Sequence, residues 1–260
     1  MIFTDQLNRQ INIGERPKRI VSLVPSQTEL LVDLGIRDSI VGITKFCIHP
    51  KELREQKTIV GGTKNVKVDK IKALNPDIIL CNKEENSLEI VETLKEIAPI
   101  HISDIYNLND VFELFEMYAD IFQVKEKATL LISKIKKERK YFQNKIQGIS
   151  KRKVAYFIWK NPWMVAASNT FIDVMLAEAG FENVFKTESR YPEVSLNHSK
   201  LKEAEVIMLS SEPFPFKEKH IAELKNSFPK KEIILVDGEL FSWYGSRLKY
   251  AYKYFETLSV

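Results

Sequence analysis

One hydrophobic periodicity, between residues 124 and 148, organises the chain. Its apolar residues recur at spacings of three, four and seven, the pattern of one buried helix face: Ala128, Leu131, Ile132, Ile135, Phe142 and Ile146. Lysines and an arginine crowd the other face of the helix. A helix of this length spans roughly 37 Å, about the width of a small domain. The pattern fits an ordinary surface helix or a spine between two lobes, and we favour the spine because α/β patterns lie on both sides of it.

Before this helix, short apolar runs alternate with helical patterns. Residues 2–13 predict a hairpin, and strands are expected over residues 19–24, 40–43, 58–60 and 78–81. Ser26 and Glu29 form a capping-box pattern for a helix that Gly35 ends, and a short helix is expected over 69–74. Strands that alternate with helices imply parallel βα units.

After the helix the pattern restarts, with strands over 154–159, 205–209 and 232–236, a helix capped by Thr170 with Asp173 and ended by Gly180, and a last helix over 246–259. The segment 77–84 is echoed by 205–212. The echo places Glu84 and Glu212 just beyond a strand, where open α/β sheets bind ligands. We therefore expect two α/β lobes, residues 1–122 and 151–260, joined by a helix at 123–150, with the two glutamates facing each other across a cleft.

Composition narrows the classes of protein. Hydrophobic residues make up 44% and charged residues 28%, which is typical of a soluble globular protein. The net charge of +4 comes largely from the run KIKKERK at 134–140, which fits a solvated helix face better than a nucleic-acid site. Two cysteines provide no disulfide framework. The N-terminus has no signal-peptide pattern and no run could span a membrane, so we expect a cytoplasmic protein, or a periplasmic one whose leader has been removed.

Several loops that follow predicted strands carry reactive side chains. Cys47 and His49 lie on one loop, and with glutamates at strand ends they could bind zinc or iron, although a buried cysteine and a turn histidine are the simpler interpretation. Aromatic residues in predicted loops could line a cleft for a flat ligand: Phe46, Trp163, Tyr191, Phe214, Phe216 and Trp243. Basic residues could pair with ligand carboxylates: Lys64, Lys217, Lys219 and Arg247.

Four segments carry a resemblance to a known family: PKRIVSLVPSQTELLVDLGI, VGITKFCIHP, VDKIKALNPDIIL and DGELFSWYGSRL. Nearly the whole chain resembles the cobalamin and ferric-siderophore class of ABC-transporter substrate-binding proteins, the helical-backbone metal receptors. The resemblance is strongest to cobalamin-binding members. It implies an α/β fold of two Rossmann-like lobes joined by a single long backbone helix, the class III periplasmic-binding-protein fold, with the ligand held between the lobes.

The resemblance also implies roles for single residues. Family aromatics of the cleft fall on Phe46, on Trp163 or Met164, and on Tyr191, and a family arginine falls on Arg247. Two family tryptophans are replaced by Thr63 and Asn82, which leaves open a ligand smaller or more polar than a corrinoid. Acidic residues that dock on the transporter in the family correspond to Asp69 and to Asn197, and only Asp69 is acidic.

The predicted function is capture of a corrinoid, ferric siderophore or haem for ABC-type uptake. We expect a monomer with no covalent cofactor, a bound corrinoid, ferric chelate or metal ion, a permease as partner, and no nucleic acid. Cys47 and His49 are metal candidates, and the predicted ligand-binding residues are Phe46, Lys64, Glu84, Trp163, Tyr191, Glu212, Trp243 and Arg247. The alternatives are a cytosolic metal or corrinoid carrier without a transporter, and a small metal-dependent enzyme using Cys47, His49 and the glutamates. No GxSxG, Walker A, GxGxxG or HExxH motif favours an enzyme.

Overall fold

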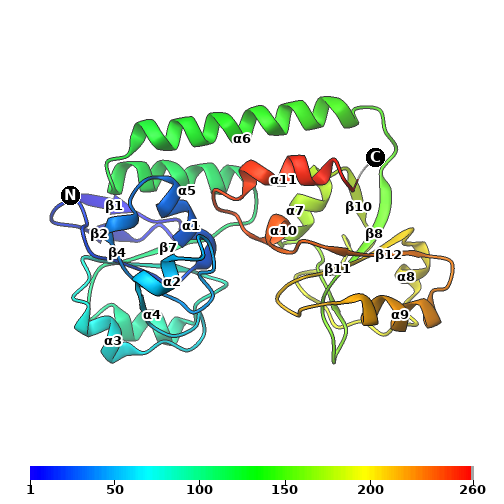
Figure 1. Ribbon diagram of the computed structural model, residues 1–260, viewed down its shortest axis with the longest axis horizontal. Coiled ribbons are helices and arrows are strands. Elements are labelled where there is room, and N and C mark those ends of the chain that lie inside the picture. The colour runs from blue at the N-terminus through cyan, green and yellow to red at the C-terminus, as the bar shows by residue number, and fades with distance from the viewer. Residues whose placement is uncertain (259–260) are drawn as a thin grey trace. The chain divides into compact units, whose positions relative to one another are not determined.

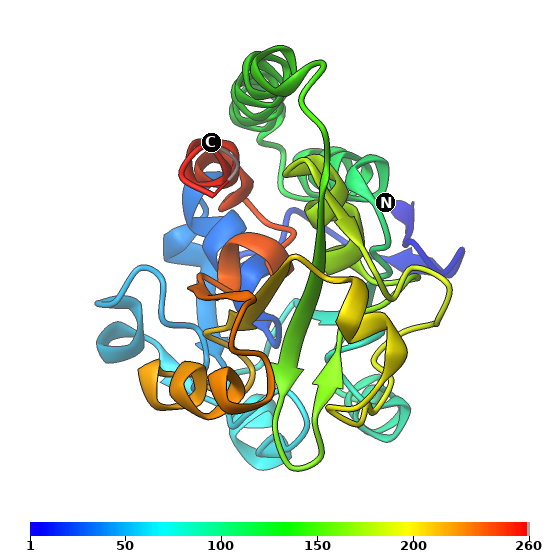
Figure 2. The same ribbon diagram turned by 90° about the vertical axis from the view of Figure 1, so that its right-hand side faces the viewer.

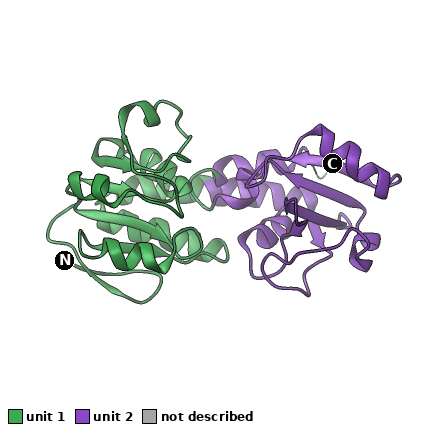
Figure 3. Cartoon of the chain, turned by 90° about the horizontal axis from the view of Figure 1, so that it is seen from below, with its two compact units in different colours: residues 1–134, 244–247 green, residues 135–243, 248–260 purple. Residues whose placement is uncertain are grey.

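The structure is a computed structural model that describes residues 1–258 (Figure 1). The chain forms two compact units (Figure 3): unit 1 comprises Met1–Lys134 and Tyr244–Arg247, and unit 2 comprises Ile135–Trp243 and the described residues from Leu248 onward. Helix α6, Lys125–Ile146, begins in unit 1 and ends in unit 2. Its predicted apolar stripe is confirmed, because Ala128, Ile135 and Phe142 are buried at spacings of seven.

Unit 1 is built on a five-stranded parallel sheet in the order β5-β4-β3-β6-β7. The strands are β3 Ile20–Ser22, β4 Ile40–Ile43, β5 Thr58–Ile59, β6 Ile78–Asn82 and β7 Ile100–Ser103. The helices are α1 Pro25–Asp33, η1 Arg37–Ser39, α2 Leu53–Gln56, α3 Val68–Ala73, α4 Leu88–Leu94 and α5 Leu108–Ile121. Residues 78–81 are fully buried, which fits their uninterrupted apolar pattern in the middle of a covered sheet.

The predicted N-terminal hairpin consists of β1 Ile2–Thr4 and β2 Gln10–Asn12. Its turn covers the outer edge of β7. Asp5 accepts a hydrogen bond from the backbone N–H of Ile102, and Arg9 donates one to the carbonyl of Ile100. Asp5 and Arg9 also form an ion pair at 2.7 Å, so this edge strand is closed to further pairing.

Unit 2 repeats the architecture with strands in the order β10-β8-β11-β12, all parallel, and with β9 antiparallel to β8 (Figure 2). The strands are β8 Arg152–Trp159, β9 Met164–Val165, β10 Phe181–Asn183, β11 Val206–Ser210 and β12 Glu232–Val236. The helices are α7 Phe171–Glu178, α8 Ser199–Glu203, α9 Glu218–Ser227, α10 Glu239–Ser242 and α11 Leu248–Phe255.

The two units share a detail that supports the internal repeat. The order β4-β3-β6-β7 in unit 1 corresponds to β10-β8-β11-β12 in unit 2. Asp77, before β6, exchanges hydrogen bonds with the backbone of Arg19, donating at 2.8 Å and accepting at 2.9 Å. Glu205, before β11, does the same with Lys153, at 2.8 and 2.7 Å. Glu84 therefore holds the same topological position after β6 that Glu212 holds after β11.

Two predicted helix boundaries are wrong. The capping box at Ser26 does not form: the N-cap of α1 is Val24, and Pro25 is the first helical residue, because proline's fixed φ suits that position.

The last helix begins at Leu248 rather than at residue 246, since the preceding segment packs against α1: a Cβ on Gly245 would lie 2.4 Å from the Ser26 carbonyl oxygen. It ends at Phe255, and residue 259 lies outside the described part of the chain. The cap at Thr170 is confirmed.

Candidate functional site

Phe46 lies on an exposed turn after β4, at the carboxyl edge of the unit 1 sheet. Its side chain is 48% exposed, and the Lys45 ammonium lies 5.0 Å from the ring centroid. Gly62 allows the ring to lie close to the neighbouring loop, since a Cβ there would be 3.2 Å from the ring. The turn thus presents an aromatic face with a positive charge beside it.

Asn82 shapes the loop after β6 through its side-chain hydrogen bonds. Its Oδ1 accepts hydrogen bonds from the backbone N–H groups of Glu84 and Glu85 at 2.9 and 3.1 Å. Its Nδ2 donates to the Ser103 hydroxyl and carbonyl. Lys64 is brought to the same loop and donates to the Glu84 carbonyl at 2.5 Å. The structure thus brings together two predicted ligand-binding residues, Lys64 and Glu84, through the backbone carbonyl of Glu84.

A buried hydrogen-bonded chain in unit 1 is not apparent from the sequence. The Tyr118 hydroxyl donates to Gln27 at 2.7 Å, and Gln27 donates to the Ser103 hydroxyl at 2.5 Å. Burial raises the pKa of Tyr118, which keeps the phenol protonated as a donor. In the sequence, the only sign of these hydrogen bonds is Gln27, a polar residue in the first turns of α1, which are buried.

Cys47 and His49 separate into different environments. Cys47 is fully buried, with its Sγ 3.2 Å from the Thr28 hydroxyl and 3.3 Å from that of Thr44. Burial raises the pKa of the Cys47 thiol, so thiolate is disfavoured. His49 is half-buried. Across residues 1–258, no group of three or more His, Cys, Asp and Glu side chains is arranged to hold a metal ion. Metal binding at this pair stays a prediction.

Arg247, a predicted ligand anchor, is engaged with Glu29. Its Nε and Nη2 donate to the two carboxylate oxygens of Glu29 at 2.9 and 3.0 Å. The two side chains are only 12% and 10% exposed. Burial raises the pKa of Glu29, and the guanidinium opposes that shift. Glu29 was not a predicted site residue.

In unit 2 the structure brings together two predicted site residues, Glu212 and Trp243. One carboxylate oxygen of Glu212 accepts hydrogen bonds from the Trp243 indole N–H at 2.9 Å and from the Ser242 hydroxyl at 2.6 Å. Burial raises the pKa of Glu212, and the neighbouring carboxylates Glu239 and Asp237 add to the shift. The carboxylate thus fixes the orientation of the indole.

Trp163 and Tyr191 lie on neighbouring segments of unit 2. Trp163 packs edge-on against Phe157 and is stacked on Phe216, with ring centroids 5.5 and 6.0 Å apart. Backbone hydrogen bonds join the two segments, from Val194 N–H to the Trp163 carbonyl and from Val165 N–H to the Pro192 carbonyl. Tyr191 is half-buried beside the Arg190 guanidinium. Trp163 is therefore largely a rim residue of the unit 2 core.

The predicted docking residue Asp69 is exposed in the first turn of α3. Lys67, Lys70 and Lys72 are exposed around it, which makes this surface basic. Asn197 is also exposed.

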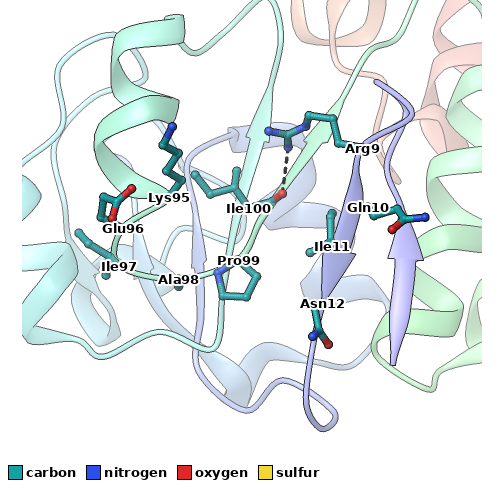
Figure 4. Close-up of a pocket in the computed structure, with 10 residues that line it drawn as sticks. All are labelled: Arg9, Gln10, Ile11, Asn12, Lys95, Glu96, Ile97, Ala98, Pro99 and Ile100. Atoms are coloured by element: carbon teal, nitrogen blue, oxygen red, sulfur yellow. Dashed lines mark hydrogen bonds between the residues drawn. The ribbon is translucent and has the colours of Figure 1, made fainter.

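A surface pocket of about 470 Å³ lies away from these residues (Figure 4). It is lined by residues 9–12 of the hairpin and 95–100 at the amino end of β7, where Arg9 binds the Ile100 carbonyl. Ligands of open α/β sheets bind at the opposite, carboxyl ends of the strands.

Residues 20–235 match the family described as periplasmic binding protein, so the chain belongs to this family. Over 180 residues it is 31% identical to an uncharacterized ABC transporter substrate-binding lipoprotein of Bacillus subtilis, covering 66% of this chain and 57% of that protein. It is 25% identical over 199 residues to a vitamin B12-binding protein of Vibrio parahaemolyticus, covering 76% and 72% of the two chains.

The fold is shared with a solved periplasmic heme binding protein from Pseudomonas aeruginosa. The TM-score is 0.80 at 19% identity, and the match covers 94% of this chain and 92% of that one. The predicted family and fold class are confirmed. Within the described part of the chain, no helix has the length and apolar character that crossing a membrane requires.

Proposed function

We propose that this protein captures a metal chelate, either a corrinoid, a haem or a ferric siderophore, and delivers it to an ABC-type uptake system. The observation that carries the proposal is the periplasmic-binding-protein family match across residues 20–235. Relatives named for ABC transport and for vitamin B12 binding, and a structural neighbour named for heme binding, support this choice of ligands.

In this proposal, the loops after the parallel strands contact the ligand. In unit 1, Phe46 provides an exposed aromatic face, and Lys45 beside it and Lys64 nearby provide cations for ligand carboxylates. In unit 2, Trp243 provides an indole whose orientation Glu212 fixes. Glu84, Trp163, Tyr191 and Arg247 complete the proposed set.

Arg247 acts indirectly in this proposal. Its guanidinium is already bound by Glu29, so a ligand gains less from it than from a cation that faces solvent. Asn82 likewise holds a loop through four hydrogen bonds. We infer that aromatic faces supply most of the binding free energy, and that the protein performs no chemistry on its ligand.

The uptake partner in this proposal is a membrane permease. Asp69 is the docking residue proposed on unit 1, because its carboxylate is exposed at the start of α3. The lysines around Asp69 would be repelled by a basic permease surface. Asp69→Lys should therefore weaken docking only if the Asp69 carboxylate contacts the permease directly.

The test is to purify the protein from its own source and to record its native mass spectrum and absorbance spectrum. A bound corrinoid, haem or ferric chelate would give both a mass increment and a visible band. The same preparation is then stripped and titrated by calorimetry with cyanocobalamin, haemin and ferric siderophores. Absence of binding to all three classes, together with turnover of a small substrate, would contradict the proposal.

A further inference from the structure

The positive charge of the chain is concentrated in helix α6. This helix carries seven lysines and one arginine against two glutamates, a net charge of +6, whereas the whole chain carries +4. The rest of the chain is therefore slightly acidic. Because the positive charge is concentrated on α6, an anionic partner would be attracted most strongly to the exposed face of this helix.

The exposed face of α6 is the one opposite its buried residues. Ala128, Ile135 and Phe142 define the buried side. Residues Leu130, Lys134, Lys137 and Tyr141 recur at spacings of four, three and four, so they form one line on the opposite side of the helix. Leu130 is 64% exposed and Tyr141 is 61% exposed, and Lys134 and Lys137 are exposed between them.

Some basic residues of α6 already have acidic partners. Arg139 donates two hydrogen bonds to Glu178, and Lys145 pairs with Glu256 at 3.1 Å. Lys134, Lys137 and Lys140 are exposed, and within residues 1–258 they form no ion pair. Three cations and two large apolar side chains thus project from the same stretch of helix.

We propose that this face of α6, defined by Leu130, Lys134, Lys137, Lys140 and Tyr141, docks on the surface of an anionic lipid bilayer. Lysines near such a surface are attracted to its headgroups, and a leucine and a tyrosine between them can enter the interface. The 22-residue helix is roughly 33 Å long. The exposed leucine favours lipid over nucleic acid, whose phosphates would gain nothing from it.

The test is vesicle flotation at ~0.1 M salt, where surface charges still act over about 10 Å. The apo protein is compared on vesicles of phosphatidylcholine with phosphatidylglycerol and on vesicles of phosphatidylcholine alone. We expect binding only to the anionic vesicles. The triple variant Lys134→Gln, Lys137→Gln, Lys140→Gln should bind about tenfold less or weaker still. Leu130→Ser with Tyr141→Ser should also weaken binding, at unchanged charge.

A matched control removes the same number of exposed lysines from α3 and its N-cap, as Lys67→Gln, Lys70→Gln, Lys72→Gln. This variant should bind like the unmodified protein, and circular dichroism should show all variants folded. Equal loss in both triple variants would overturn the proposal, because it would show a response to net charge alone. So would absence of binding to anionic vesicles, or binding to duplex DNA that the Leu130→Ser, Tyr141→Ser variant retains.

Discussion

Arg247 and Glu29, 218 residues apart in the sequence, form a largely buried ion pair joined by two hydrogen bonds. The pair ties the segment Tyr244–Arg247 to helix α1 within unit 1, although the residues on both sides of that segment belong to unit 2. The chain therefore passes from one unit to the other not only within α6 but also before Tyr244 and after Arg247.

The first prediction concerns this ion pair. Arg247→Met leaves the Glu29 carboxylate in a site that is only 10% exposed, so the free energy of unfolding should fall by about 2–4 kcal/mol. Urea denaturation followed by circular dichroism measures the change. The double variant Glu29→Leu, Arg247→Met should recover part of the loss, because no unpaired charge remains. Equal stability of Arg247→Met and the unmodified protein would show that the pair contributes nothing.

The second prediction concerns His101, which is fully buried on β7 with its ring 5.2 Å from that of Tyr118. Neither ring nitrogen has a hydrogen-bond partner among residues 1–258. Burial lowers the pKa of His101 to about 4. The unfolded chain, in which the pKa of His101 is 6.5, binds the proton more tightly than the folded protein does. Protonation of His101 therefore lowers the free energy of unfolding. The contribution of the neutral side chain is fully present above pH 6.5 and is lost as pH falls towards 4.

The stability lost over this window should be about 3 kcal/mol. In the variant His101→Phe, which keeps a ring beside Tyr118, this part of the pH dependence should be absent. Urea denaturation at a series of pH values from neutral to acid measures the difference between the two proteins. If the free energy of unfolding of the two proteins changed equally with pH, His101 would not be the group that takes up the proton on unfolding.

Much of the fold could be predicted because its signals are local. The apolar stripe of α6 recurs over six turns, and β6 and β11 are uninterrupted apolar runs with a polar residue at each end. The predicted start of α1 is wrong because Ser26 and Glu29 fit a capping box, while Pro25 sets the helix start before them. The fixed φ of Pro25 therefore outweighs the capping-box motif that begins one residue later.

The candidate site was predictable only residue by residue. Glu212 and Trp243 were both expected from their loops, yet their hydrogen bond spans 31 positions and leaves no mark in the local pattern. Glu29 fits a capping box in the local pattern, and no local pattern can indicate its partner Arg247, which lies 218 residues away. For Cys47 the simpler interpretation, a buried cysteine, is confirmed, because the side chain is fully buried between two threonines.

The third prediction compares two glycines. A Cβ on Gly238 would lie 2.3 Å from the Ser210 hydroxyl and 2.7 Å from the Glu212 side chain. Gly238→Ala should therefore displace the loop that holds Glu212 and lower the free energy of unfolding by about 1–3 kcal/mol. Gly14→Ala is the matched control, since a Cβ there meets nothing within 4 Å. Similar thermal midpoints for both variants would show that the loop after β11 tolerates a side chain.

The last prediction concerns ligand binding by Trp243, with the chelate recovered from the native protein as the probe. Trp243→Ala should weaken binding by about 1–3 kcal/mol, roughly fivefold to 150-fold, as loss of an aromatic anchor does in other interfaces. Glu212→Leu should act in the same direction, because it removes the oxygen that orients the indole, whereas Glu212→Gln retains an acceptor and should change affinity much less. Tyr250→Ala, which removes a 52% exposed aromatic from α11, is the control and should bind normally. Calorimetry measures all four affinities, with folding checked by circular dichroism. Unchanged affinity in folded Trp243→Ala would place the ligand elsewhere, since an indole in contact with a flat chelate cannot be removed without loss of buried apolar area.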